Sequence, residues 1–188
     1  MRQGRKALVL LIAAAALIGC GGGSGGGEDV TGGGGTTVSA DFIADQPSPP
    51  PSTVAMEKGP NSSNLVSVRV DATGVSNIYG AAFELAFDGN LAEYVGFTPG
   101  SFFEQGGHVP TYQVSSPGAG EVVVGVTRNG NVAGVSTTSS KAMVNLTFRV
   151  KVAGSGAVAV QNAVLYDAQI QPQPVSGITW EAGTLRGN

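Results

Sequence analysis

The nine residues from Tyr79 to Phe87 are Tyr-Gly-Ala-Ala-Phe-Glu-Leu-Ala-Phe. Successive side chains of a β-strand point to opposite faces, so this order separates bulky apolar residues from small ones. One face holds Tyr79, Ala81, Phe83, Leu85 and Phe87, and the other holds Gly80, Ala82, Glu84 and Ala86. The stretch therefore predicts a strand with one face in a core and a surface of small residues on the other.

Similar runs lie on both sides of this stretch and are separated by Gly, Pro, Asn and Asp about every ten residues, a spacing typical of β-sandwiches. In one of them Val66, Val68 and Val70 alternate with more polar residues. No stretch sustains the helical period of 3.6 residues. With residues 79–87 the predicted strands number nine, the others being 65–70, 91–98, 112–115, 122–128, 142–152, 157–161, 164–166 and 178–185. The pattern predicts an all-β, antiparallel sandwich.

The composition provides few residues of the types that act in catalysis. The chain of 188 residues has one cysteine and one histidine, so it lacks the ligands of a zinc site, a disulfide or a histidine relay. We expect His108 to be solvated or packed in a loop. A glycosidase-like carboxylate pair would have to come from Glu84, Glu93, Glu104 and Glu121, but a sandwich of this size leaves little room for a substrate cleft. We predict a protein that is not an enzyme and that has no cofactor or metal.

The N-terminus has the pattern of an export signal. Arg2, Arg5 and Lys6 precede the apolar run 7–18, which is too short to span a bilayer as a helix. The following Leu-Ile-Gly-Cys, which ends at Cys20, resembles the lipobox of bacterial lipoproteins. The resemblance implies that residues 1–19 are a signal peptide and that Cys20 carries the lipid. It also implies an exported protein sorted to the outer membrane or cell surface, since Gly21 stands where an aspartate favours inner-membrane retention.

Residues 20–53 are predicted to form a disordered Gly/Pro-rich tether in front of a domain at 54–188. Ten of the fifteen residues from Gly21 to Gly35 are glycine, and Pro47, Pro49, Pro50 and Pro51 follow. Glycine runs behave as flexible coil and prolines stiffen a chain. For residues 38–44 two interpretations stay open, a short strand or a segment that adheres to the domain.

Net charge argues against a nucleic-acid partner. Removing residues 1–19 takes away three of the ten Lys and Arg residues and none of the thirteen Asp and Glu residues, which leaves a formal net charge of −6. The seven remaining cations form no cluster in sequence, whereas nucleic-acid binding needs a basic surface. The predicted membrane contact is through the lipid alone.

From Gly80 to Leu91 and beyond, the sequence resembles the cohesin domains. The resemblance rests on Gly80–Leu91 with its Phe-Asp turn, on Pro99-Gly100-Ser101-Phe102-Phe103, and on the later runs Val122–Val126 and Val144–Val150. It departs at Gly89, where the family usually has proline. The resemblance covers residues 54–188 and implies a nine-stranded jelly roll with a non-catalytic role. Cohesins bind dockerins, which are small calcium-loaded helical modules, through one flat sheet face.

The resemblance also implies where a partner binds. Type I cohesins carry an Asn-x-Asp pair at the positions that are Gly80 and Ala82 here, so that hydrogen-bonding pair is absent. The partner-binding face implied by the resemblance is Gly80, Ala82, Glu84, Ala86, Val123, Gly125, Thr127 and Arg128. Its expected partner is a dockerin-like module or another surface protein. The alternative is a plain solvated face, or one covered by residues 38–44.

A carbohydrate-binding module of the same fold, acting in polysaccharide binding or catabolism, is the second hypothesis. Such modules stack sugar rings on exposed aromatic side chains. The supply is one tryptophan, Trp180, which is expected in the core, and four tyrosines, Tyr79, Tyr94, Tyr112 and Tyr166. This hypothesis predicts at least three coplanar, exposed aromatic residues on one face.

Overall fold

The computed structural model describes residues 38–188. The predicted signal peptide, Cys20 and most of the predicted tether lie outside the described residues. Residues 38–188 form β-strands joined by turns and loops, and they contain no helix long and apolar enough to cross a membrane.

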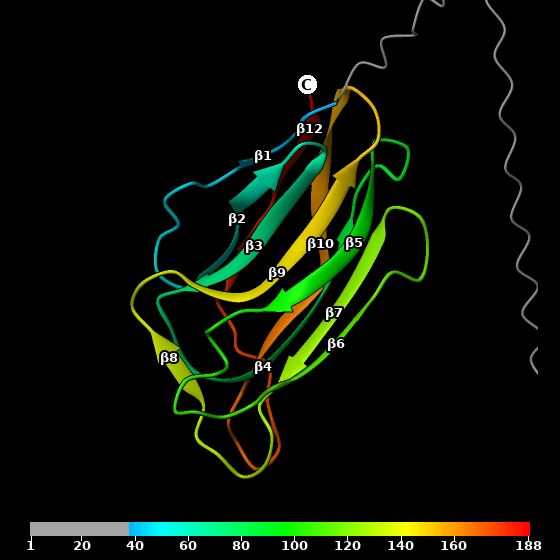
Figure 1. The fold of residues 1–188 in the computed structure, drawn as a ribbon. Helices are drawn as coiled ribbons and strands as arrows, with labels where there is room; N and C mark the ends of the chain where they lie inside the picture. Colours follow the sequence, from blue (N-terminus) through cyan, green and yellow to red (C-terminus); the bar gives the residue numbers. More distant parts are fainter. Residues whose placement is uncertain (1–37) are drawn as a thin grey trace, which may run out of the picture. The chain divides into compact units, whose positions relative to one another are not determined.

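Two sheets pack face to face (Figure 1). The 7-stranded sheet has the order β1 (Ala40–Ala44), β12 (Gly183–Gly187), β10 (Gly154–Asp167), β4 (Val75–Ala86), β7 (Glu121–Thr127), β6 (Thr111–Ser115), with β8 (Val135–Thr137) paired to β4. The 5-stranded sheet has the order β11 (Thr179–Glu181), β2 (Thr53–Ser62), β3 (Leu65–Thr73), β9 (Lys141–Val150), β5 (Ala92–Pro99). The predicted all-β sandwich is confirmed.

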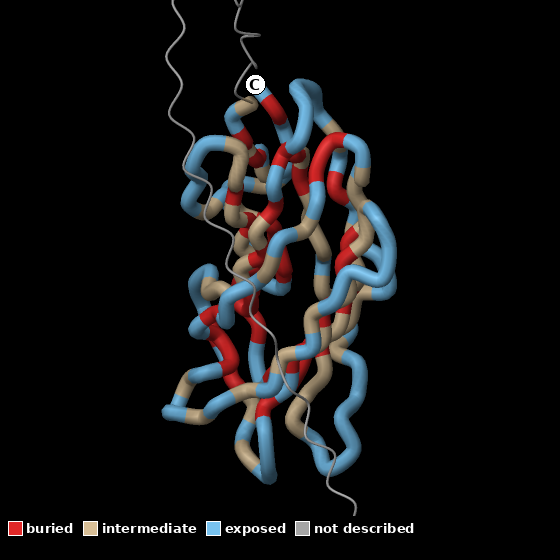
Figure 2. The backbone as a smooth tube through the Cα atoms, turned by 45° about the vertical axis from the view of Figure 1, so that its right-hand side comes forward, coloured by how far each residue is buried: buried red, intermediate tan, exposed pale blue. Residues whose placement is uncertain are grey.

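The core lies between the sheets, where the alternating strands direct their larger side chains. Phe83 and Leu85 of β4 belong to the same buried core cluster as Phe148 and Leu146 of β9. The ring of Phe148 also contacts Phe87 edge-on, with ring centroids 5.2 Å apart. Buried residues alternate along the strands while most connecting loops are exposed (Figure 2). The large apolar side chains that alternate in the sequence therefore stabilise the sandwich by packing between its sheets.

The predicted strand number was wrong, because the described residues contain twelve strands. β2 was missed because Gly59 and Pro60 resemble a strand end, whereas they lie at a register shift between Lys58 and Asn61 that leaves the pairing with β3 intact on both sides. The runs 157–161 and 164–166 are one strand, β10, with a bulge between them. The run 178–185 is divided into β11 and β12. The pairing is antiparallel except between β11 and β2, which are parallel.

The folded part begins before Val54, the boundary predicted from the sequence. β1 lies in the segment assigned to the tether, yet it pairs with β12 over five residues. Its Phe42 is 2% exposed, and the Asn61 side-chain amide donates a hydrogen bond to the Ala40 carbonyl. An ion pair between Asp41 and Lys58 joins β1 to β2 and holds the pKa of the Asp41 carboxyl below its usual value. Residues 40–44 therefore form an edge strand of the sandwich.

Candidate functional site

The outward residues of β4 and β7 form one continuous surface, which we call the small-residue face. It consists of Gly80, Ala82, Glu84 and Ala86 of β4 with Val123, Gly125 and Thr127 of β7. The register pairs Gly80 with Thr127, Ala82 with Gly125, and Glu84 with Val123. The structure thus brings seven of the eight residues singled out from the sequence together on adjacent strands. β1 lies at the far edge of the sheet, beyond β12 and β10, so residues 38–44 do not cover this face.

Arg128, the eighth residue, is not on the small-residue face. It follows β7, where its side chain turns inward and is 4% exposed. Its Nη1 donates hydrogen bonds to the carbonyl oxygens of Phe103 at 2.9 Å and Gln105 at 3.0 Å. The placement predicted from the sequence was wrong because the guanidinium satisfies carbonyls of the turn after Phe102. Arg128 holds that turn against the end of the sheet.

Tyr79 also lies differently from the prediction, which placed it in the core. Asn77 has a φ of 57°, and β4 has one residue more than β10 between Ile78 and Gly80. This bulge turns Ile78 into the core, where it is fully buried, and turns Tyr79 outward. The Tyr79 hydroxyl donates a hydrogen bond to the Gly130 carbonyl oxygen at 2.5 Å. Asn77 is the one sequence signal for the bulge, since Asn tolerates positive φ better than most residues.

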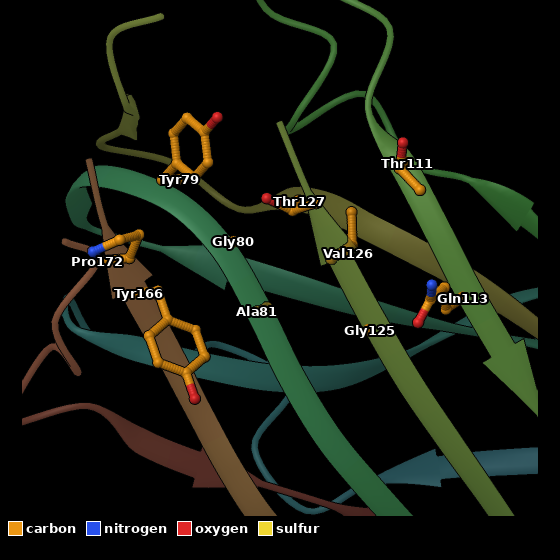
Figure 3. A pocket seen from close by; sticks show the side chains of 10 residues that line it. All are labelled: Tyr79, Gly80, Ala81, Thr111, Gln113, Gly125, Val126, Thr127, Tyr166 and Pro172. Carbon is orange, nitrogen blue, oxygen red and sulfur yellow. The ribbon is translucent and has the colours of Figure 1, made fainter. Parts of the chain in front are cut away.

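An open cavity of about 390 Å³ lies at the Tyr79 end of the small-residue face. Figure 3 shows Tyr79, Tyr166 and Pro172 on one side of it and Thr111 and Gln113 on the other. Gly80 and Gly125 lie between these walls and form the floor of the cavity. Because they have no side chains, the space above them stays open. The walls come from β4, β6, β10 and the loop after β10. Because these segments are far apart in the chain, the sequence did not predict the cavity.

Glu84 is the charged group at the centre of the small-residue face. Its Oε2 accepts a hydrogen bond from the Asn162 side-chain amide at 2.7 Å. Asn162 has a φ of 47° in the β10 bulge, which turns its side chain toward β4. Among the side chains of β4, β6, β7 and β10, the charged ones are Glu84, Glu121 and Asp167, and these strands contain no Lys or Arg.

The outer face of the 5-stranded sheet is more highly charged. Arg69 pairs with Asp71 and Arg149 pairs with Glu93, each at 2.6 Å. Asp71 is buried, and this burial raises the pKa of its carboxyl although Arg69 opposes the shift. Because interface centres are depleted of charge, the small-residue face is the better candidate for a binding surface.

Among residues 38–188, no three His, Cys, Asp or Glu side chains gather as metal ligands. Of the four glutamates considered from the sequence, Glu93 pairs with Arg149 on the other sheet and Glu104 is exposed in a turn. His108 is half-buried in the loop before β6.

The aromatic residues do not form the platform that the carbohydrate hypothesis predicts. Trp180 packs on Phe83, with ring centroids 5.4 Å apart. Tyr94 packs on Phe148, and the Tyr112 hydroxyl donates to the Met143 carbonyl oxygen at 2.9 Å. In the described part of the chain, the small-residue face is accompanied by two aromatic side chains, Tyr79 and Tyr166, and not by three.

A family described as Cohesin domain matches residues 53–179. Among curated proteins none matches the sequence.

Several solved structures are similar in fold. The second type II cohesin module of the ScaA scaffoldin from Acetivibrio cellulolyticus is 11% identical, with a TM-score of 0.55, and the match covers 78% of this chain and 88% of that one. The third ScaC cohesin of the same organism, solved in complex with the ScaB dockerin, is 19% identical, with a TM-score of 0.52 and coverages of 64% and 86%. The seventh ScaB type I cohesin of Pseudobacteroides cellulosolvens is 13% identical, with a TM-score of 0.51 and coverages of 64% and 80%. At these identities the likeness shows the fold.

Proposed function

The chain belongs to the cohesin family, and from this premise we propose that it is a membrane-anchored recognition module that binds a dockerin or another protein partner. Cohesin domains are non-catalytic protein-interaction modules, and the similar ScaC cohesin was solved with a dockerin bound. The proposal extends this role to the present chain. It places the domain on a stalk at the cell surface and assigns it no catalytic step.

The small-residue face carries the proposal for partner binding. Ala82 and Ala86 on β4 and Gly125 on β7 are small and partly exposed, so a partner helix can approach these strands closely. Gly80 and Ala82 stand where type I cohesins have their Asn-x-Asp pair, so we propose that apolar packing holds the partner instead of that polar pair. Thr127 and Gln113 remain at the edge of the surface to satisfy polar groups of the partner.

Partner binding is tested with a photo-crosslinking residue at position 82, and with the same residue at Ser67 on the outer face of the other sheet as the control. The exported chain is incubated with envelope and secreted proteins of its own organism. We expect a protein adduct from position 82 and none from position 67. The partner, identified by mass spectrometry and purified, should then lose about 30-fold in affinity for Ala82→Arg and keep its affinity for Ser67→Arg, because the first buries an unpaired charge. No adduct, or equal adducts from both positions, would contradict the proposal.

Anchoring rests on the N-terminal pattern and has its own test. We expect the N-terminal peptide of the exported protein to begin at Cys20 and to carry a diacylglycerol mass. A Cys20→Ala variant should lose this mass and move from the membrane to the soluble fraction, since stable attachment depends on the acyl chains. A Ser24→Ala variant, four residues away, is the control and should stay in the membrane. Retention of both variants in the membrane would argue against the lipid anchor.

A further inference from the structure

The cavity beside the small-residue face indicates what the partner must present there, an inference that rests on the proposed function. We propose that the cavity beside Tyr79 and Tyr166 receives one bulky apolar side chain of the partner, preferably an aromatic one, while Glu84 accepts a basic side chain of the same partner. The first contact fixes the position of the partner along the face. The second selects its charge.

The two glycines in the floor of the cavity, Gly80 and Gly125, differ in whether the fold requires a glycine at that position. A Cβ atom at Gly80 would lie 2.8 Å from the Val126 carbonyl oxygen, so close packing of the sheet excludes a side chain there. A Cβ atom at Gly125 would meet nothing nearer than the Gln113 carbonyl oxygen at 3.8 Å, and its φ is not positive. Neither packing nor backbone conformation therefore requires glycine at position 125.

A glycine inside a strand weakens the strand, and it often marks a place where another molecule comes close. At Gly125 the missing side chain keeps the cavity open. A larger residue at this position would fill the space between Gln113 and Tyr166. The geometry thus assigns Gly125 to binding rather than to folding.

The walls of the cavity suit an apolar group. Tyr79 is held in place by its hydrogen bond to Gly130, and the Tyr166 ring and Pro172 complete that side. A cavity of about 390 Å³ lies within the range of small-ligand pockets, which are mainly apolar with few polar groups. Aromatic walls that are already oriented reduce the entropy lost on binding.

Charge gives the second requirement. The four strands that form this face carry Glu84, Glu121 and Asp167 and no Lys or Arg, and Asn162 orients the Glu84 carboxylate, so the complementary partner is basic at this point. Gly80 and Glu84 are four residues apart on β4, which is about 13 Å. On a partner helix lying along β4, residues i and i+8 are about 12 Å apart, which is close to this distance. The proposed occupant is a helix with an aromatic residue and a Lys or Arg two turns apart.

The cavity is tested by NMR titration of the exported chain carrying Cys20→Ser, with N-acetyl-tryptophanamide as the probe. We expect saturable shifts, with millimolar affinity, at the amides of Gly80, Gly125 and Thr127. N-acetyl-alaninamide should give no comparable shifts, because it cannot fill the cavity. Gly125→Leu should remove the response to the tryptophan probe, whereas Ala159→Leu on β10 should keep it. Shifts with cellohexaose and none with the tryptophan probe would make this a sugar site and overturn the proposal, as would an unchanged response in Gly125→Leu.

The charge requirement is tested with a helical peptide that carries Trp and Arg eight residues apart. Replacing its Arg by Glu should weaken binding about two- to five-fold, and Glu84→Gln should abolish that difference. Equal binding of both peptides would overturn this part. The outcomes also separate the two proposals. A crosslinked partner without probe binding overturns the cavity inference alone, whereas the absence of a crosslinked partner overturns the proposed function and, with it, the assignment of the cavity to a partner side chain.

Discussion

We expect a chain shortened to begin at Thr53 to have a free energy of unfolding about 3–5 kcal/mol lower than that of a chain that begins at Thr36. The shorter form keeps the whole segment that matches the family, residues 53–179, but it lacks β1. Phe42 is the main reason for the loss, because its ring is buried and lies so close to Gly183 that a Cβ atom there would collide with it. Without β1, the edge of β12 and part of the core would be exposed.

The measurement is urea unfolding of both forms, followed by tryptophan fluorescence and circular dichroism. Phe42→Ala in the longer chain separates the packing contribution and should account for most of the loss. Ile43→Ala is the matched control on the same strand, because Ile43 is 40% exposed and its truncation should cost less than about 1 kcal/mol. Equal stability of the two chain lengths would show that β1 is dispensable.

The alternation of residue types predicted most of the sandwich but failed at two bulges, at Asn77 and at Gly59 and Pro60. Alternation assumes that each residue moves the chain to the opposite face, and a bulge breaks this rule. At Asn77 the bulge exchanged Ile78 and Tyr79 between core and surface. At Gly59 and Pro60 it made a continuous strand look like its end. Both errors are local, and the pattern is correct again beyond each bulge.

β1 was uncertain for a different reason. Its five residues lie between a glycine run and a proline run, and a short segment with one Phe and one Ile shows too few alternations to indicate a strand. What makes β1 a strand is the open edge of β12, together with the space beside Gly183 that Phe42 fills. These partners are about 140 residues away in the chain. Tertiary packing of this kind leaves no local signal.

The candidate site was partly predictable for the same physical reasons. Gly80, Ala82, Glu84 and Ala86 share a face by alternation alone, and Val123, Gly125 and Thr127 do so on β7. The cavity was not predictable, because its walls at Tyr166 and Pro172 come from segments far along the chain. Arg128 was assigned to the partner-binding face by the resemblance, because it ends the run that carries Val123, Gly125 and Thr127. The carbonyls that draw it inward belong to the turn at Phe103 and Gln105.

Arg128→Ala is expected to lower the free energy of unfolding by about 3 kcal/mol, since each hydrogen bond from a charged donor contributes roughly 1.5–3 kcal/mol. The buried guanidinium donates to the carbonyl oxygens of Phe103 and Gln105, and the truncation leaves the Phe103 carbonyl without this donor. Arg149→Ala is the control, because Arg149 is exposed and pairs with an exposed Glu93, so its loss should cost less than about 1 kcal/mol.

Urea unfolding gives the stability of both arginine variants, and amide hydrogen exchange locates the change. Exchange in Arg128→Ala should be faster than in the original chain for the turn that includes Phe103 and Gln105, and unchanged in β3. Because this turn adjoins the Thr127 end of the small-residue face, partner affinity should also decrease in Arg128→Ala and stay constant in Arg149→Ala. If the two arginine variants were equally stable and bound the partner equally well, Arg128 would neither support the turn nor shape the binding surface.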